Sequence, residues 1–284
     1  MERRIAWIGF GEAARAFAAG VRDAAFSAYD LKHDAAMRAA LAEADVAAAK
    51  TPGEALAGAE AALSLVTADQ ALAAARDYAS HLSPGALWLD MNSVAPETKR
   101  SAAAAVEAAG GRYVDVAVMA PVHPAHRDVP LLVSGPHAEA GAACLEALGF
   151  TRVHTIEGGV GAASSVKMIR SVLVKGLEAL TAECMLAAEA AGVRGEVLAS
   201  LDASDEPMPW VARADYHLER MLVHGTRRAA EMEEVLKTLE ALGVEPAMTR
   251  GTVHRQRAAG AIGQGAPDTL DAKLHLLDRK AQVA

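Results

Sequence analysis

The sequence predicts an α/β protein, with a doubly wound parallel sheet in its N-terminal part and an all-α C-terminal part. Three observations predict this fold class. An apolar run at residues 5–8 leads into Gly-x-Gly-x-x-Ala and then into helix-forming residues, the order of strand, tight turn and helix. Short apolar runs then alternate with Ala-rich helical segments up to residue 157, as in βαβ units. After Gly161 the strand patterns all but disappear, so helices are expected from there on.

The first turn has the composition of a dinucleotide site. Gly9 lets the chain turn sharply, Gly11 lets a pyrophosphate approach the backbone, and Ala14 lets the helix pack close to the strand. The helix N-terminus offers N–H groups and a partial positive charge. A glycine-rich turn without a ligand has the same spacing, but the strand before it favours a Rossmann domain. The expected cofactor contacts are Gly9, Phe10, Gly11, Glu12, Ala13 and Asp30 and, at the ends of later strands, Thr67, Asn92 and Ser93.

Asp30 bears on the choice of cofactor. It follows the second apolar run, about 20 residues beyond the turn, where a carboxylate accepts hydrogen bonds from ribose hydroxyls and repels a 2′-phosphate. Lys32 and His33 offer opposing positive charge. We therefore expect NAD or NADP as the cofactor, with NAD slightly favoured. Thr67, Asn92 and Ser93 have an alternative interpretation as turn residues that cap helices.

Strands are expected at residues 5–8, 25–29, 61–67, 86–90, 112–118, 130–135 and 152–156. Helices are expected at 34–44, 68–78, 96–109, 137–148, 162–191, 196–201, 210–223, 227–242, 250–259 and 270–281. Pro96 is expected to open its helix because proline is tolerated in a first turn. Gly243 is expected to end the helix before it.

The helix expected at residues 162–191 is unusually long. Its apolar residues recur at helical spacing: Val166, Ile169, Leu173, Leu177, Leu180, Cys184 and Ala188. A helix of about 30 residues exceeds the usual globular range, so we expect it to bridge two domains. The expected division is a dinucleotide-binding domain at 1–157, an interdomain helix at 158–191, and a helical domain for substrate binding and dimerisation at 192–284.

Composition excludes several classes of function. The formal net charge is −8 with no basic block, which argues against a nucleic-acid partner. No apolar run reaches the roughly 18 residues that span a membrane, and the first strand starts too early to leave room for a signal peptide. Cys144 and Cys184 lack Cys-x-x-Cys spacing and are expected to be buried thiols in a reducing cytoplasm. His123 and His126 lack a carboxylate at ligand spacing, so no metal is expected.

A polar stripe on the long helix is the candidate for chemistry. Lys167, Ser171, Lys175 and Glu178 follow one another at spacings of four, four and three, so they share a face. A lysine can move a hydroxyl proton if its pKa falls toward neutrality, and like charge from Arg170 and Lys175 acts in that direction. A solvated face of an ordinary helix has the same pattern.

The order of these motifs resembles the β-hydroxyacid dehydrogenase superfamily, which includes 3-hydroxyisobutyrate and 6-phosphogluconate dehydrogenases. The resemblance covers nearly the whole chain, and is closest to a branch with a helical C-terminal domain of unknown function. Residues 90–96, Asp-Met-Asn-Ser-Val-Ala-Pro, resemble the family's Asp-x-Ser-Thr-x-x-Pro stretch. Residues 161–171 resemble its Gly-x-Gly-x-x-x-Lys-x-x-x-Asn helix, with Ser171 at the asparagine position. The resemblance implies that Lys167 is the catalytic lysine.

Two departures affect the substrate. The family's Asp-x-Pro-Val-Ser-Gly-Gly loop reads Asp-Val-Ala-Val-Met-Ala-Pro at residues 115–121, without the Ser-Gly-Gly that holds a substrate carboxylate. The family's later lysine aligns with Ala230. Lys175 and the segment 224–228 look like the branch's own pattern. The expected substrate contacts are Met119, Ser171, Lys175, His224 and Arg228.

These observations predict an NAD(P)-dependent oxidoreductase that transfers a hydride between nicotinamide and a small-molecule hydroxy acid or polyol-type alcohol, with Lys167 as general acid/base. One alternative is a C=N (imine) reductase on the same fold, which needs no alcohol-activating lysine. Another is a non-catalytic dinucleotide sensor. Because relatives pair through their helical domains, the resemblance also implies a homodimer.

Overall fold

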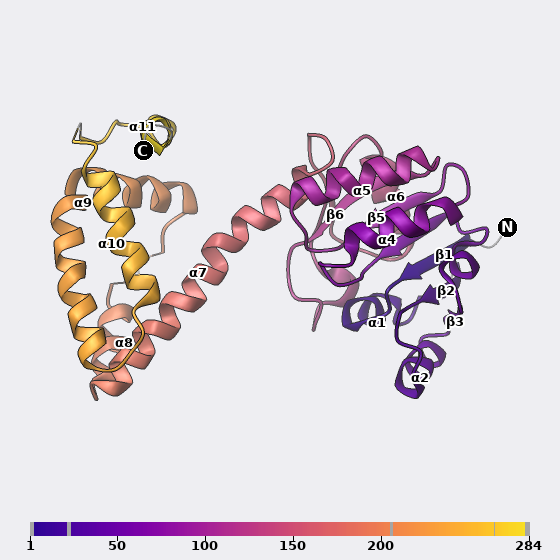
Figure 1. Ribbon diagram of the computed structural model, residues 1–284, viewed down its shortest axis with the longest axis horizontal. Helices are drawn as coiled ribbons and strands as arrows, with labels where there is room; N and C mark the ends of the chain where they lie inside the picture. The colour runs from indigo at the N-terminus through magenta and orange to yellow at the C-terminus, as the bar shows by residue number, and fades with distance from the viewer. Residues whose placement is uncertain (1–2, 22–23, 205–206, 264, 282–284) are drawn as a thin grey trace. The chain divides into compact units, whose positions relative to one another are not determined.

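The computed structural model describes residues 3–21, 24–204, 207–263 and 265–281. The chain forms two compact units, Met1–Val172 (unit 1) and Leu173–Ala284 (unit 2). Unit 1 contains all the strands in the described residues, and unit 2 is helical in the part that the structure describes (Figure 1). One helix, α7 (Ala162–Ala190), begins in unit 1 and continues into unit 2.

Unit 1 is built on one eight-stranded sheet with the order β3-β2-β1-β4-β5-β6-β7-β8. The strands are β1 (Arg3–Ile8), β2 (Ala24–Tyr29), β3 (Ala47–Ala48), β4 (Ala61–Ser64), β5 (Leu87–Asp90), β6 (Arg112–Val118), β7 (Leu131–Ser134) and β8 (Val153–Thr155). All neighbouring pairs are parallel except β6 and β7. The connection between those two contains only the short 3₁₀ helix η2 (His126–Asp128), whereas parallel strands are usually joined by a crossover that contains an α-helix. The predicted α/β class is confirmed, with a mostly parallel sheet.

The helices of unit 1 are α1 (Glu12–Ala18), α2 (Ala35–Glu43), α3 (Pro52–Leu56), α4 (Ala71–Tyr78), the 3₁₀ helix η1 (Ala79–His81), α5 (Pro96–Ala108) and α6 (Ala138–Ala147). Helix α3 and the two-residue strand β3 were not predicted from the sequence. A capping signal for α3 is nevertheless present, because the Thr51 hydroxyl accepts from the Glu54 N–H at 3.2 Å and Pro52 occupies the first turn.

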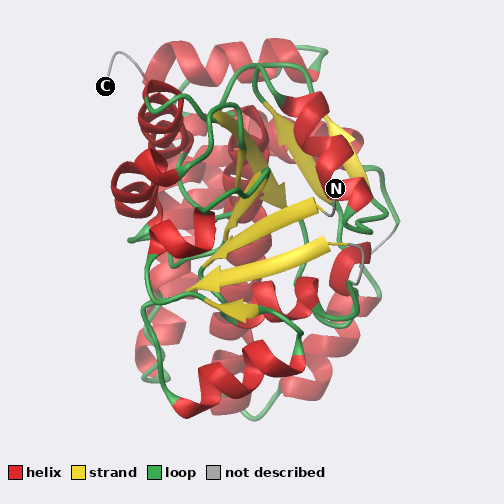
Figure 2. Cartoon of the chain, turned by 90° about the vertical axis from the view of Figure 1, so that its right-hand side faces the viewer, coloured by secondary structure: helices red, strands yellow, loops and turns green. Residues whose placement is uncertain are grey.

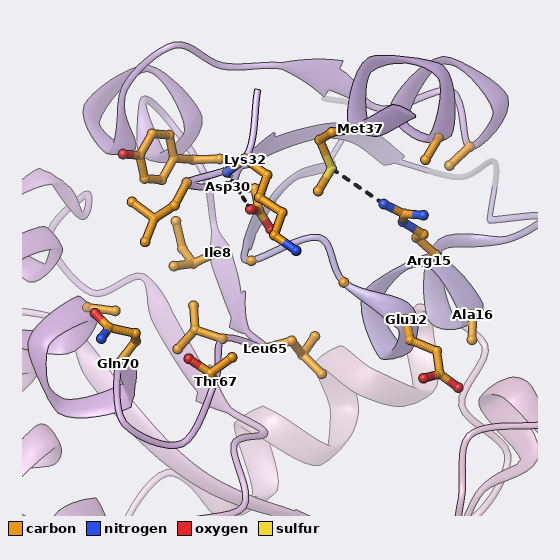
Figure 3. Close-up of a pocket in the computed structure, with 18 of the residues that line it drawn as sticks. Ile8, Glu12, Arg15, Ala16, Asp30, Lys32, Met37, Leu65, Thr67 and Gln70 are labelled. Atoms are coloured by element: carbon orange, nitrogen blue, oxygen red, sulfur yellow. Dashed lines mark hydrogen bonds between the residues drawn. The ribbon is translucent and has the colours of Figure 1, made fainter. Parts of the chain in front are cut away.

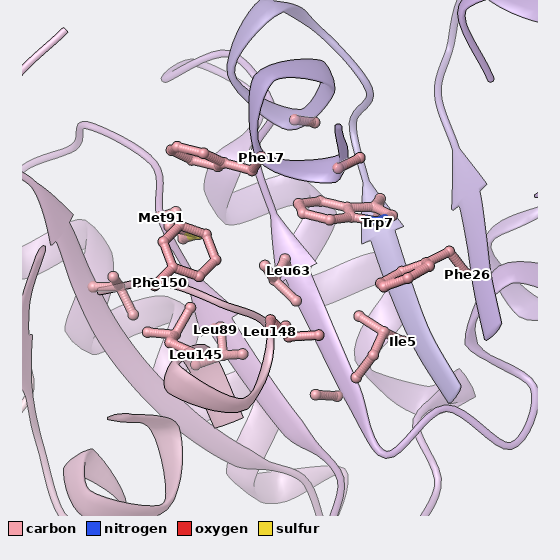
Figure 4. Close-up of a cluster of buried hydrophobic side chains, with 14 of the residues drawn as sticks. Ile5, Trp7, Phe17, Phe26, Leu63, Leu89, Met91, Leu145, Leu148 and Phe150 are labelled. Atoms are coloured by element: carbon pink, nitrogen blue, oxygen red, sulfur yellow. The ribbon is translucent and has the colours of Figure 1, made fainter. Parts of the chain in front are cut away.

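The core of unit 1 lies on both faces of the sheet. Figure 2 shows the strands of this sheet with helices around them. In β1, Ile5 and Trp7 belong to the cluster on one face, and Ala6 and Ile8 to the cluster on the other. All four are at most 2% exposed, which is typical of a parallel strand covered by helices on both sides. Figure 4 shows the first cluster, where the rings of Phe17 and Phe150 pack edge to face with centroids 5.0 Å apart.

Unit 2 contains the rest of α7, then α8 (Arg194–Asp202), α9 (Trp210–Ala241), α10 (Ala247–Gly260) and α11 (Leu270–Ala281). The prediction of separate helices at 210–223 and 227–242 is wrong, because α9 continues through Gly225. A Cβ on Gly225 would lie 2.3 Å from the Gln256 carbonyl oxygen, and one on Gly260 would lie 2.2 Å from the Thr226 nitrogen. The two glycines therefore allow α9 and α10 to pack closely, as the two helices do in Figure 1.

Much of the apolar face of α7 is exposed in this chain. Five of its residues, here called the α7 apolar row, are between 42% and 72% exposed: Val166, Ile169, Leu173, Leu177 and Leu180. Cys184 is exposed as well, so the prediction that both cysteines are buried is wrong for this one. Cys144 is partly buried, and burial raises the pKa of its thiol to about 11. Among the described residues no helix is both long and apolar enough to cross a membrane.

Candidate dinucleotide and catalytic site

A cavity of about 980 Å³ opens in unit 1 where β1, β2 and β4 end. Ligands of doubly wound sheets bind beyond the carboxyl ends of the strands, and ligand pockets typically measure about 300–1,000 Å³. Five residues predicted to contact a cofactor line the cavity: Gly9, Gly11, Glu12, Asp30 and Thr67. In the view of Figure 3, Asp30, Lys32 and Arg15 lie on one side of the cavity, with Leu65, Thr67 and Gln70 on the other.

The glycine turn between β1 and α1 fits a dinucleotide. Gly9 has a φ of +86°, and a Cβ there would lie 2.5 Å from the Leu65 carbonyl oxygen, so only glycine fits. Gly11 is the N-cap residue of α1, and a Cβ there would meet nothing within 4 Å. Open space beside a helix N-terminus is what a pyrophosphate needs.

Asp30 connects the end of β2 to this turn. Its carboxylate accepts from the backbone N–H of Phe10 at 2.7 Å and from that of Lys32 at 2.8 Å. The ring of Phe10 is fully buried in the core, so Phe10 contributes its backbone to the turn. Ala13 lies in the first turn of α1 and packs against the same core.

Other cavity residues were not predicted as contacts. Arg15 donates to the Phe10 carbonyl at 3.1 Å and contacts the Met37 sulfur at 3.9 Å. His123 Nε2 lies 3.9 Å from Glu12 Oε1, and a ring nitrogen of His126 lies 3.3 Å from a backbone carbonyl of α1. The two histidines lie in the loop between the antiparallel strands β6 and β7. Nothing in the sequence indicated that this loop lies beside α1. The described residues contain no group of three or more side chains that could hold a metal ion.

Lys167 meets the loop that follows β5. Its Nζ donates to the Ser93 hydroxyl at 2.6 Å, so two residues predicted for the site come together. Ser171 donates its hydroxyl to the Lys167 carbonyl at 2.9 Å, within the helix. Arg170 donates to the Met119 carbonyl oxygen at 3.4 Å, which places Met119 beside the start of α7. Glu178 and Lys175 follow in unit 2.

A buried charge cluster lies at the carboxyl end of β5 and beside it in the middle of β6. Lys99 of α5 is fully buried and donates to Asp90 Oδ1 at 2.9 Å, and its Nζ lies 3.4 Å from Asp115 Oδ1. Asn92 was predicted to contact cofactor, but its side-chain amide donates to Asp90 and to Ser64 inside the protein. Lys99 was not predicted as a site residue, although its spacing to the buried residues of α5 marks a lysine on an apolar helix face.

Asp115 of this cluster and the neighbouring Ser134 also hold the first turn of α7. Asp115 Oδ2 accepts from the backbone N–H groups of Gly161 at 3.0 Å and Ser164 at 3.2 Å. The hydroxyl of Ser134 accepts from the N–H of Ala163 at 2.9 Å. Tyr113 donates to Asp90 at 2.6 Å, and burial together with the Asp90 charge raises the pKa of Tyr113 well above its usual value.

The remaining predicted substrate residues, Lys175, His224 and Arg228, belong to unit 2. His224 and Arg228 are partly buried on α9. The Nε atom of Arg228 is buried and has no hydrogen-bond partner among the described residues. Their role in one site with Lys167 stays a prediction.

Comparisons with known proteins bear on this site. Residues 4–154 match the family described as the NAD binding domain of 6-phosphogluconate dehydrogenase, and residues 188–259 match a domain of unknown function, DUF1932. A conserved hypothetical protein from Sinorhizobium meliloti 1021 is 39% identical over 98% of this chain and 97% of its own, with a TM-score of 0.61.

Two further solved structures are similar over nearly their whole length. One is a conserved protein of unknown function with structural similarity to 3-hydroxyacid dehydrogenases. It is 27% identical over 96% of this chain and 99% of its own, with a TM-score of 0.60. The other is an imine reductase from Myxococcus stipitatus in complex with NADP⁺. It is 19% identical over 97% of this chain and 99% of its own, with a TM-score of 0.76, and at this identity the likeness shows the fold.

The NAD-binding match covers residues 4–154 of 284, more than half of the chain. It coincides with the sheet, the glycine turn and the cavity of unit 1, and supports a nicotinamide dinucleotide as the cofactor. The chain therefore belongs to the β-hydroxyacid dehydrogenase-like superfamily of oxidoreductases, with a 6-phosphogluconate dehydrogenase-type NAD-binding domain and a helical C-terminal region.

Proposed function

We propose that this chain is an NAD(P)-dependent dehydrogenase or reductase acting on a CH–OH group, with Lys167 as the general acid/base. The observation that carries the proposal is the 2.6 Å contact between Lys167 Nζ and the Ser93 hydroxyl. Ser93 follows the carboxyl end of β5, and the dinucleotide cavity opens at the carboxyl ends of β1, β2 and β4. The carboxyl ends of parallel strands lie at the same edge of a sheet, so an alcohol bound near Ser93 would lie at the same edge as the cofactor.

The bound nicotinamide would supply or accept the hydride. Lys167 would take the hydroxyl proton when the alcohol is oxidised and return it in the reverse direction. The Ser93 hydroxyl keeps Nζ at a fixed position, which general acid/base catalysis requires before any tuning of pKa.

The substrate proposed is a hydroxy acid or polyol-type alcohol. The loop at 119–121 supplies few backbone donors, because the N–H of Met119 is used by the Pro130 carbonyl at 2.8 Å and Pro121 has none. Side chains must then recognise the substrate. We propose that Met119 and Ser171 of unit 1, and Lys175, His224 and Arg228 of unit 2, take that role.

We also propose a homodimer formed through the helical part of the chain. Support comes from the α7 apolar row, whose five residues are at least 42% exposed. A soluble monomer rarely leaves so continuous an apolar stripe in water, and a second copy of α7 would offer a complementary one.

The test is a screen of hydroxy acids and polyols with both nicotinamide cofactors, run on the parent and on Lys167→Ala, with Lys50→Ala at an exposed position as the matched control. We expect Lys167→Ala to bind NADH as the parent does and to lose about 10²–10⁴-fold in kcat, the usual contribution of a general acid/base. Cyclic imines belong in the same screen. Undiminished imine turnover by Lys167→Ala would favour C=N reduction, and cofactor binding without any turnover would favour a sensor.

A further inference from the structure

The buried side chains of Asp90, Lys99 and Asp115 form a charge cluster that takes no direct part in the reaction proposed above. Asp90 and Asp115 lie opposite each other on the neighbouring parallel strands β5 and β6. Both are fully buried, and so is Lys99 between them. Charged side chains are rarely fully buried unless their partners compensate for the lost hydration. Besides Oδ1 of Asp90, Lys99 donates to the Asp90 carbonyl at 2.5 Å.

Each carboxylate holds one side of the contact between Lys167 and Ser93. Asp90 Oδ1 accepts from the backbone N–H of Asn92 at 3.0 Å and from its amide at 2.8 Å, which fixes the residue directly before Ser93. Asp115 Oδ2 accepts from the N–H and the hydroxyl of Ser164, each at 3.2 Å. Ser164 lies in the turn of α7 that precedes Lys167.

The cluster also carries a charge imbalance. Two carboxylates face a single ammonium, which leaves one surplus negative charge at the start of α7. Asp115 Oδ1 makes no hydrogen bond among the described residues and faces only Lys99 Nζ, at 3.4 Å. The helix N-terminus adds partial positive charge there.

Other charged groups lie near the start of α7. Arg100 of α5 comes close to Gly161, since a Cβ on that glycine would lie 2.6 Å from its Nη1. Glu97 pairs with Arg100 at 2.8 Å, and both side chains are more than half exposed, so solvent screens that pair. Arg170 contributes a further positive charge from α7 itself. The carboxylates of Asp90 and Asp115 are buried, so solvent screens them less than it screens this exposed pair.

We propose that the Asp90–Lys99–Asp115 cluster is a positioning element for Lys167, which fixes both sides of its contact with Ser93 and supplies the negative charge that balances its ammonium. The inference rests on the proposed function in one respect, that Lys167 is the acid/base. It makes Asp115 and Lys99 residues that act through Lys167 without touching substrate.

The test follows Lys167 directly and needs no substrate. The pH dependence of acetylation by acetic anhydride is measured for each lysine by mass spectrometry, with exposed Lys50 as the internal reference. In Asp115→Asn the midpoint for Lys167 should fall by about 0.5–1 pH unit, because one nearby negative charge is lost. In Lys99→Met it should not fall, because a positive charge is removed instead. The Lys50 midpoint should stay unchanged in both variants.

This pair separates charge from loosened packing, since a general loss of order would move both variants in the same direction. Val106→Ala, a cavity variant at a fully buried position of α5, is the stability control and should leave Lys167 as in the parent. If Asp115→Asn does not fold, Asp90→Asn removes the same charge from the other carboxylate and is expected to lower the midpoint likewise.

A parental Lys167 midpoint in the folded Asp-to-Asn variant, or the same fall in Lys99→Met, overturns the proposal. NADH binding is measured on the same samples. A parent that binds no cofactor would defeat the proposed function while leaving the Lys167 titration interpretable.

Discussion

The carboxylate of Asp30 and the backbone N–H of Phe10 lie 2.7 Å apart, which joins the end of β2 to the glycine turn. The residue expected to select the cofactor therefore also shapes the loop that would hold its phosphates. The second carboxylate oxygen of Asp30 accepts from the backbone N–H of Lys32 at 2.8 Å. A ribose must share this carboxylate with two backbone donors, so substitutions at Asp30 should affect affinity as well as selectivity.

The first prediction concerns the choice between NAD and NADP. We expect the parent to bind NADH more tightly than NADPH, because the Asp30 carboxylate repels a 2′-phosphate. Asp30→Asn removes the charge while keeping the shape, and should narrow the ratio of the two dissociation constants about tenfold, within the usual range of tuned specificity. Asp30→Ala should also weaken NADH, since it removes the acceptor for Phe10. Tighter NADPH binding by the parent would show that Lys32 and Arg15 decide the choice instead.

The second prediction separates the two glycines of the turn. Gly11→Val should fold with a parental Tm, because its Cβ enters open space, yet lose NADH affinity because the side chain fills the pyrophosphate path. Gly9→Ala should lower stability by about 1–3 kcal/mol or more, since φ is +86° and its Cβ meets the Leu65 carbonyl at 2.5 Å. Thermal unfolding and fluorescence titration with NADH measure the two effects. Unchanged affinity in Gly11→Val would contradict a cofactor at this turn.

The third prediction concerns the α7 apolar row. Sedimentation velocity should find the parent as a dimer, and Leu177→Glu should dissociate it by placing a carboxylate in an apolar contact twice per dimer. Glu178→Lys changes the charge of the adjacent exposed residue and should remain dimeric, which controls for charge alone. A monomeric parent at micromolar concentration would refute the homodimer.

The fourth prediction concerns Glu183, a buried acid of unit 2. It accepts from the N–H groups of Met248 and Thr249 at 2.8 and 2.9 Å, and from the Thr249 hydroxyl at 2.5 Å. It thereby holds the start of α10. Burial raises the pKa of Glu183, but these hydrogen bonds outweigh burial and leave the pKa below its usual value of 4.5.

A depressed carboxyl pKa stabilises the fold above the usual pKa, and the contribution is lost as the pH falls through the depressed value. Glu183→Gln should therefore lower the free energy of unfolding by about 1–3 kcal/mol at pH 7. The difference from the parent should shrink as the pH falls below 4.5. Urea unfolding at a series of pH values measures it, and a difference independent of pH would show that the charge is irrelevant.

Local patterns predicted the elements that depend on local chemistry. The bounds of α5 follow from Pro96 and the glycines after it, and the turn at Gly9 follows from the strand before it. The helix break expected between residues 223 and 227 does not occur, because Gly225 continues the helix and allows Gly260 of another helix to approach closely. Nothing within ten residues of Gly225 could distinguish a close helix contact from a helix end.

In the candidate site, too, single residues could be predicted from the sequence, whereas the contacts between distant segments could not. Lys167 and Ser93 could be proposed from motifs, but their contact depends on how the sheet and α7 meet. Lys99 could be recognised only as a lysine on an apolar face. Its partners Asp90 and Asp115 come together through the register of two strands, which a single sequence does not specify. Cys184 was misjudged because apolar neighbours on a helix do not reveal whether this chain covers them.

At the start of α7, the backbone donors that could bind an anion are already used. The N–H groups of Gly161, Ala163 and Ser164 are all taken by Asp115 and Ser134, so an incoming anion finds no backbone receptor there. An anionic substrate of the kind proposed would have to be recognised by side chains at this end of α7. Because one point mutation can replace a side chain, whereas a backbone receptor changes only with the fold, substrate specificity determined in this way could change while the scaffold stays intact.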